Sequence, residues 1–182
     1  MKVLVRSALL AAACNLLFGC LVSERPLFDA SNAAATPIAA GPYEACSGSS
    51  EDEEVECNPM QIELGDDGLY VFAVDDDRIE TRFSDLGAGD YAMQMAEGDD
   101  GFMYYWGRMT GDALTITMLW CSDLPRILVE KLVDDGVIET DDDYTTCTVK
   151  SRGAVVAAAK SYAAGEAVSD SWVELRPATA VQ

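Results

Sequence analysis

The chain is rich in carboxylates and has no histidine, and this combination limits the chemistry open to it. Its 182 residues include 32 Asp or Glu, 12 Lys or Arg and no His, which gives a formal net charge of −20. Without histidine there is no Ser-His-Asp triad, no Cys-His pair and no His-ligated zinc or haem. The acidic excess argues against nucleic acid as a partner, because phosphate binding needs Lys and Arg.

Paired carboxylates could still serve a glycan-processing enzyme or bind calcium. A glycosidase-type pair needs one acid desolvated enough to hold its proton. Here the acid clusters lie in polar, turn-like contexts, and only Glu63, Glu80 and Asp85 lie inside strand patterns. No Asp run continues as an EF-hand loop, which needs Gly at position 6 and Glu at position 12. We expect solvated turns, with no metal, cofactor or catalytic residues; a carboxylate-dependent enzyme on glycans is kept as an alternative.

The first twenty residues have the organisation of an export signal. Lys2 and Arg6 form a positive n-region, and residues 7–19 are an uncharged, mostly apolar run. This run is too short to span a bilayer core, which needs about 20 residues, and it matches the h-region of a secretory signal. It leads into Leu17-Phe18-Gly19-Cys20, which resembles the lipobox of bacterial lipoproteins.

The resemblance implies that the Cys20 sulfur receives a diacylglyceryl group and that cleavage leaves Cys20 as the acylated N-terminus. Two or three acyl chains anchor a protein stably, whereas one binds a membrane only marginally. Leu21 stands where an Asp in the Gram-negative family tends to mean inner-membrane retention, so the resemblance implies the periplasmic face of the outer membrane. Two alternatives stay open: a second lipobox ending at Cys14, and an ordinary cleaved signal.

The chain after the signal divides into a tether, a body and a tail. Without residues 1–19 it carries 10 basic and 32 acidic side chains, a formal charge of −22. Residues 20–41 are expected to be the lipidated N-terminus and a flexible tether, because Ala, Ser, Asn, Thr and Pro dominate without apolar periodicity. Residues 42–176 are expected to form a single acidic β-rich domain, and residues 177–182 a frayed tail.

The body alternates apolar strands with acidic turns. Apolar residues at period two predict six short strands at 60–64, 69–74, 78–85, 91–95, 102–109 and 113–120. The Asp- and Gly-containing turns between them are typical of hairpins. The pattern therefore predicts an antiparallel meander or a small barrel-like sheet of about six to eight strands.

The rest of the body changes character. Pro125 can open a helix that runs to about Asp134, and residues 151–164 predict an Ala-rich helix that stops at Gly165. Residues 144–149 and 172–175 have the pattern of further strands. The expected fold class is α+β, mainly β, with two short C-terminal helices.

Four cysteines remain for structural roles: Cys46, Cys57, Cys121 and Cys147. No two lie at Cys-x-x-Cys spacing, and no histidine is present to complete a zinc site. An even number of cysteines in an exported chain predicts two disulfides, with three possible connectivities. We expect the most local one, Cys46–Cys57 with Cys121–Cys147, whose first bridge would pin a hairpin carrying residues 51–54.

An aromatic cluster is the other candidate for function. Strand alternation sends Phe102, Tyr104 and Trp106 to one face, and Met103 and Tyr105 to the other. Core packing is the default role for such residues. If one face is the core, the other can line a groove, so Tyr105 and Met103 are the candidates for a binding surface.

These observations lead to the hypothesis of a lipid-anchored envelope lipoprotein that acts as a binding or structural module. The membrane, through the N-terminal lipid, is its expected partner. An alternative is an inhibitor or decoy of a cationic protein such as lysozyme, since a charge of −22 would steer basic partners toward it.

Overall fold

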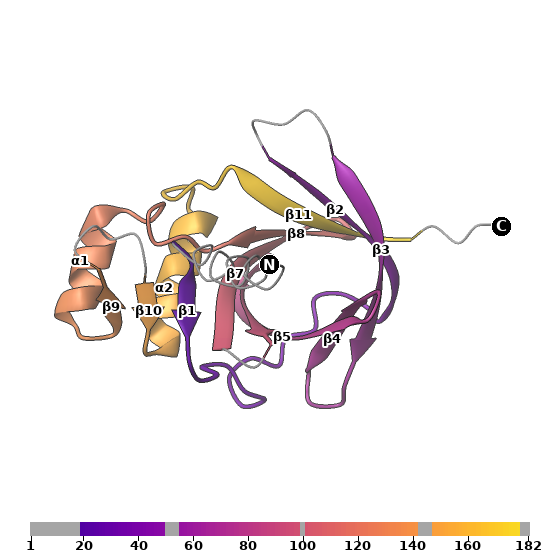
Figure 1. Cartoon of the computed structure of the whole chain (residues 1–182), viewed down its shortest axis with the longest axis horizontal. Coiled ribbons are helices and arrows are strands. Elements are labelled where there is room, and N and C mark those ends of the chain that lie inside the picture. The colour runs from indigo at the N-terminus through magenta and orange to yellow at the C-terminus, as the bar shows by residue number, and fades with distance from the viewer. Residues whose placement is uncertain (1–18, 50–54, 99–100, 142–146, 179–182) are drawn as a thin grey trace, which may run out of the picture.

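A closed antiparallel barrel forms the larger part of the molecule (Figure 1). The computed structural model describes residues 19–49, 55–98, 101–141 and 147–178. The barrel strands are β2 (Gly41–Ser49), β3 (Glu56–Leu64), β4 (Tyr70–Val74), β5 (Asp77–Gly87), β6 (Asp90–Glu97), β7 (Gly101–Thr110), β8 (Ala113–Met118) and β11 (Ser171–Pro177). Pairing of β6 with β7 closes the ring, which confirms the mainly-β, barrel-like expectation.

The six strands predicted from alternation are β3 to β8, and each pairs with the next in antiparallel register. Their inward residues build the barrel core, which includes Tyr70, Phe72, Phe83, Met93 and Leu114. Residues two apart on a strand share a face, so short local patterns were enough to predict these strands.

The last barrel strand arrives from far along the chain. β11 lies between β2 and β8 and is antiparallel to both. The predicted tail began at Pro177, and this boundary was wrong: Pro177 lies opposite Tyr43 in the sheet, and the Ala178 amide donates to the Pro42 carbonyl at 3.0 Å. Residues 179–182 lie outside the described part of the chain.

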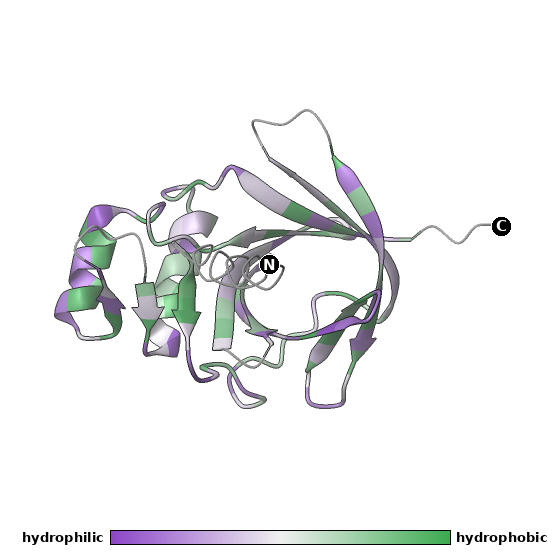
Figure 2. Ribbon diagram, viewed as in Figure 1, coloured by the Kyte–Doolittle hydropathy of each residue, from purple (hydrophilic) through white to green (hydrophobic). Residues whose placement is uncertain are grey.

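A second layer covers one side of the barrel (Figure 1). It contains β1 (Leu21–Ser23), β9 (Ile138–Thr140), β10 (Cys147–Val149), α1 (Arg126–Asp134) and α2 (Arg152–Ala163). β1 pairs with the first part of β7 and, in parallel, with β10. Leu21 is fully buried in β1, whose ribbon is coloured hydrophobic in Figure 2. A second apolar core fills the space between this layer and the outer wall of the barrel.

Both predicted helices are present, with the expected ends. Ser151 caps α2 by accepting a hydrogen bond from the Ala154 amide, and Gly165 follows its last turn with φ +72°. A positive φ after a helix favours glycine, which has no Cβ. Of the predicted strand at 144–149, β10 accounts for residues 147–149, and residues 144–146 lie outside the described part.

The predicted tether is wrong, because residues 20–41 pack into the fold. After β1, residues 24–40 form a strap that crosses the wall of the barrel. The Gln94 side chain holds the strap: its Oε1 accepts hydrogen bonds from the amides of Leu27 and Phe28, at 2.7 and 2.9 Å. Phe28 is 2% exposed, so this segment forms part of the core rather than a spacer.

The far part of the strap seals one end of the barrel. Ile38 belongs to the barrel core, and its carbonyl accepts a hydrogen bond from the Tyr70 hydroxyl at 2.7 Å. The Ala35 amide donates to the Phe83 carbonyl at 3.1 Å. Sparse apolar residues in an Ala- and Asn-rich segment carry no periodic signal, which explains why composition alone suggested a linker.

Candidate functional site

The opposite end of the barrel, which we call the mouth, is hollowed. The mouth is where β5 begins, β6 ends and β7 begins. A cavity of about 320 Å³ lies there, lined by Asp77, Arg78, Ile79, Met95, Ala96, Glu97, Gly98, Met103 and Tyr105. This volume is at the lower end of the ~300–1,000 Å³ typical of small-molecule sites. The two candidate binding residues, Tyr105 and Met103, are therefore brought together in one cavity.

Strand register explains why these side chains converge. Phe83 and Met93 lie in the barrel core. Ile79 and Met95 lie an even number of residues away on the same strands, so they have the same inward parity, that is, they share the inward face. Met95 lies directly opposite Met103. The apolar lining of the mouth thus continues the barrel core toward the end of the strands. At that end, side chains no longer fill the interior.

Two carboxylates stand at the rim of this cavity. Asp77 and Glu97 share the inward parity of Ile79 and Met95, and both are exposed. Neither residue lay inside a strand predicted from the sequence, whose nearest ranges were 78–85 and 91–95. The signal that could have singled them out is their spacing, since each lies two residues from an apolar residue of the inward face.

Arg78, the basic residue of the cavity lining, is paired with Glu63 on the outer face of the barrel instead of with the rim carboxylates. Arg78 borders the cavity, but its guanidinium donates two hydrogen bonds to Glu63, at 3.1 and 2.7 Å. Arg78, by hydrogen bonding and charge, lowers the pKa of Glu63. Glu63 is the neighbour of the inward-facing Ile62 on β3, so its side chain lies on the outer face. The pair leaves Asp77 and Glu97 uncompensated by Arg78.

Deeper in the barrel than the cavity lining lies a buried hydroxyl without a partner. Thr81 lies on the inward face between Ile79 and Phe83, directly opposite Met95, and is fully buried. Its Oγ1 makes no hydrogen bond in the described part of the chain. Buried polar atoms are nearly always hydrogen-bonded, so this hydroxyl marks a place where a further polar atom is needed.

Tyr105 forms the aromatic wall of the cavity. Burial, and then the negative charge of Glu97, raise the pKa of its phenol. Its hydroxyl contacts the Met103 sulfur at 3.9 Å. Tyr105 therefore stays neutral at any physiological pH and adds an aromatic side chain to the cavity lining.

Cys20, the predicted lipid-attachment residue, lies beside the barrel at the same end. It pairs with Trp120 in an isolated bridge, and its Sγ lies 3.0 Å from the sulfur of Met118. Cys20 is 3% exposed, and burial raises the pKa of its thiol to about 11. Met118 lies opposite Tyr105 on the adjacent strand, so the Cys20 sulfur is close to the mouth.

Both predicted disulfides are confirmed. Cys46 and Cys57 face each other on β2 and β3 and are bonded, with Cα atoms 4.0 Å apart. Cys121, after β8, is bonded to Cys147 of β10 and ties the second layer to the barrel. Residues 51–54, the expected hairpin tip, lie outside the described residues.

The other face of the aromatic cluster is structural. Tyr104 is fully buried in the core between the barrel and the second layer, where Phe102 and Trp106 also pack. Tyr104 exchanges a hydrogen bond with Ser23 of β1 at 2.6 Å. Strand alternation therefore predicted the two faces correctly, and a binding role for Tyr105 and Met103 stays a prediction.

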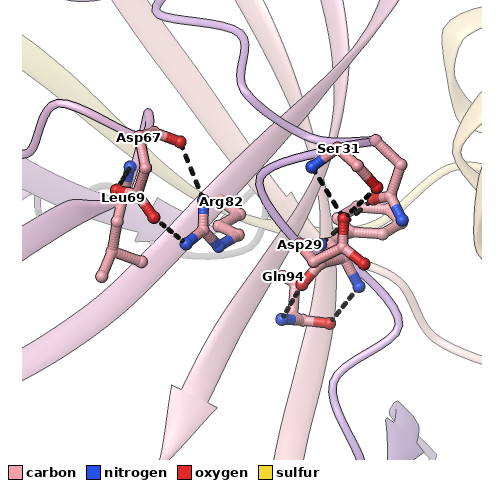
Figure 3. Close-up of polar contacts among 8 residues, drawn as sticks. Asp29, Ser31, Asp67, Leu69, Arg82 and Gln94 are labelled. Atoms are coloured by element: carbon pink, nitrogen blue, oxygen red, sulfur yellow. Dashed lines mark hydrogen bonds and ion pairs between the residues drawn. The ribbon is translucent and has the colours of Figure 1, made fainter.

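The acidic turns do not converge on a metal site in the part of the chain that the structure describes. Within these residues no three His, Cys, Asp or Glu side chains gather as metal ligands would. Likewise, neither described helix has the length and apolarity needed to cross a membrane. Some turn acids have structural partners: Asp67 accepts a hydrogen bond from Arg82 at 2.6 Å (Figure 3).

Comparisons with known proteins find no similarity from which a role could be carried over. No protein-family profile matches the chain, and neither a curated protein nor a solved structure matches it.

Proposed function

We propose that this chain is an exported, lipid-anchored envelope protein whose barrel is a binding module that acts through its mouth. The observation that carries the anchoring is Cys20, which ends the run Leu17-Phe18-Gly19-Cys20 and immediately precedes β1. Two disulfides favour the same location, because such bonds persist in oxidising compartments. The proposed site of residence is the periplasmic face of the outer membrane.

The position of Cys20 has a consequence for the anchored protein. Leu21 already belongs to the sheet and is fully buried, so no flexible spacer separates the proposed lipid from the folded body. The barrel would rest against the membrane instead of standing off by a tether. Since Cys20 lies close to Tyr105 and Met118, the mouth would lie near the membrane surface.

The binding role rests on the cavity at the mouth. Most of the barrel is filled by packed aromatic and aliphatic side chains, as in other eight-stranded barrels with little internal space. The cavity interrupts this packing at the mouth, next to two exposed carboxylates. A concave apolar surface with a few polar groups is the usual form of a small ligand site.

Fatty-acid labelling tests the anchor. Cells that express the full chain are fed a labelled fatty acid, and the protein is recovered and mapped by mass spectrometry. We expect label on the peptide that begins with Cys20, and accumulation of the unprocessed precursor when globomycin blocks lipoprotein signal cleavage. Cys20→Ser should abolish labelling, whereas Cys14→Ser, the matched control, should leave it unchanged. Retained label in Cys20→Ser, or an unmodified mature N-terminus, would overturn the anchoring at Cys20.

A further inference from the structure

We propose that the mouth of the barrel binds a hydrophobic cation, a small amphiphile with an alkyl body and an ammonium head. This inference rests on the binding role proposed above for the mouth and names the class of its ligand. The alkyl body would occupy the cavity formed by Ile79, Met95, Met103 and Tyr105. The ammonium head would lie at the rim, beside Asp77 and Glu97.

The lining suits an unbranched apolar body. Met95 and Met103 face each other across β6 and β7, and methionine side chains are flexible enough to adapt to an alkyl chain. Ile79 and the ring of Tyr105 complete the apolar wall. A volume of about 320 Å³ limits the ligand to a short chain or a single large group.

The charge of the rim selects the sign of the head group. Asp77 and Glu97 are inward-facing and exposed, and Glu56 has the same inward parity at the start of β3. No inward-facing position in the described barrel strands is occupied by Lys or Arg; their arginines, which have outward parity, are Arg78, Arg82, Arg108 and Arg176. An anionic head would therefore meet uncompensated negative charge, whereas a cation would be attracted.

Methyl NMR on the mature, membrane-anchored protein tests the proposal at the site itself. Protein with ¹³C-methyl methionine is placed in phosphatidylcholine nanodiscs and titrated with hexyltrimethylammonium, hexyl sulfate or hexanol, with empty nanodiscs as the blank. We expect hexyltrimethylammonium to shift the Met95 and Met103 signals saturably, at least tenfold more tightly than hexanol. Hexyl sulfate should leave both signals in place, and the Met109 signal at the sealed end should not respond to any probe.

A pair of double variants separates the rim from the overall charge. D77N/E97Q should weaken binding of hexyltrimethylammonium at least tenfold, toward the affinity of hexanol. E80Q/D112N removes the same number of charges from an outward position of β5 and from the β7–β8 turn, and should bind like wild type.

The outcomes distinguish the ligand class from the binding role. Equal binding of hexanol or hexyl sulfate, or equal losses in both double variants, would overturn cation selectivity while the mouth remains a binding site. The absence of any Met95 or Met103 response to all three probes would overturn the binding role of the mouth as well. Neither result bears on acylation at Cys20, which is read separately.

Discussion

Asp90 and Arg108 lie directly opposite each other on β6 and β7, and their side chains form a two-point ion pair. Arg108 Nε donates to Asp90 Oδ1 at 2.8 Å and its Nη2 donates to Oδ2 at 3.2 Å. The same Nη2 donates to the carbonyl of Ala163, the last residue of α2, at 2.9 Å. A cation at a helix C-terminus is favourable, so this one side chain joins the barrel wall to the second layer.

Arg108→Lys should therefore destabilise the protein by about 1–3 kcal/mol, the range expected when hydrogen bonds to a charged, nearly buried partner are lost. Lysine cannot reproduce the two-point contact and reach Ala163 at once. The measurement is the free energy of unfolding in urea. Arg126→Lys is the control: Arg126 pairs with Glu130 on the exposed face of α1, and such pairs contribute less than about 1 kcal/mol. Equal effects of the two variants would contradict the joining role of Arg108.

The strap over residues 24–40 depends on Gln94, whose amide also donates to the Phe28 carbonyl at 3.3 Å. Gln94→Ala leaves the Leu27 and Phe28 amides without their acceptor and should cost about 1–3 kcal/mol. Hydrogen exchange should accelerate at these two amides first, because opening of the strap precedes global unfolding. Gln61→Ala, on β3, is the control and should leave exchange in the strap unchanged. Unaltered exchange in Gln94→Ala would mean that packing of Phe28 alone holds the strap.

Gly68 in the β3–β4 turn tests the contact between this turn and the strap. Its φ is +76°, and an added Cβ would lie 2.9 Å from the Cα of Ala34. Gly111 has a similar φ of +62° in the β7–β8 turn, but a Cβ there would meet open space. Both Gly→Ala changes carry the conformational cost of about 1 kcal/mol. Gly68→Ala should be clearly the more destabilising, as measured by thermal unfolding; equal melting temperatures would contradict close packing of the strap.

Alkaline pH should weaken the fold through its buried tyrosines. Burial raises the pKa of Tyr70 to about 12 and that of Tyr104 to about 12, from an ordinary value of 10. The folded state favours the neutral phenols, so their contribution to the free energy of unfolding is fully present below pH 10. As the pH rises from 10 to 12, the unfolded chain releases these protons first and the free energy of unfolding falls.

Urea unfolding at pH 9 and pH 11 measures this loss, and the absorbance of tyrosinate reports the titration itself. Tyr70→Phe removes one titrating group, so it should lose less stability between the two pH values than wild type does. At pH 7 it should cost about 1 kcal/mol, because the Ile38 carbonyl loses its donor. An unchanged alkaline loss in this variant would show that Tyr70 does not contribute to it.

The sequence predicted the meander because strand signals are local. Tyr70 and Phe72, or Met93 and Met95, are spaced for one face of a strand whatever the rest of the chain does. The disulfide Cys46–Cys57 was predictable for a similar reason, since a bridge across one hairpin joins residues close in sequence. The helix ends at Ser151 and Gly165 follow from capping chemistry within a few residues.

The strap and the pairing of the closing strand β11 were harder to predict from the sequence. Phe28 and Ile38 are isolated apolar residues in a segment whose composition is typical of linkers, and only their distant partners make them core residues. β11 completes the ring by pairing with β2, about 130 positions earlier in the chain, and no local pattern specifies that pairing.

The sequence by itself determined the charge, the absence of histidine chemistry, the even number of cysteines left for disulfides and which residues alternate on each strand. Only the tertiary structure decided which of two alternating faces became the inside of a barrel and which end of the barrel the strap would seal. Because the sheet closes, the inward faces of β5, β6 and β7 line one cavity. This cavity brings together Asp77, Glu97, Met103 and Tyr105. The physical reason is that alternation is a property of neighbouring residues, whereas enclosure depends on hydrogen bonds between strands that meet only in the folded chain.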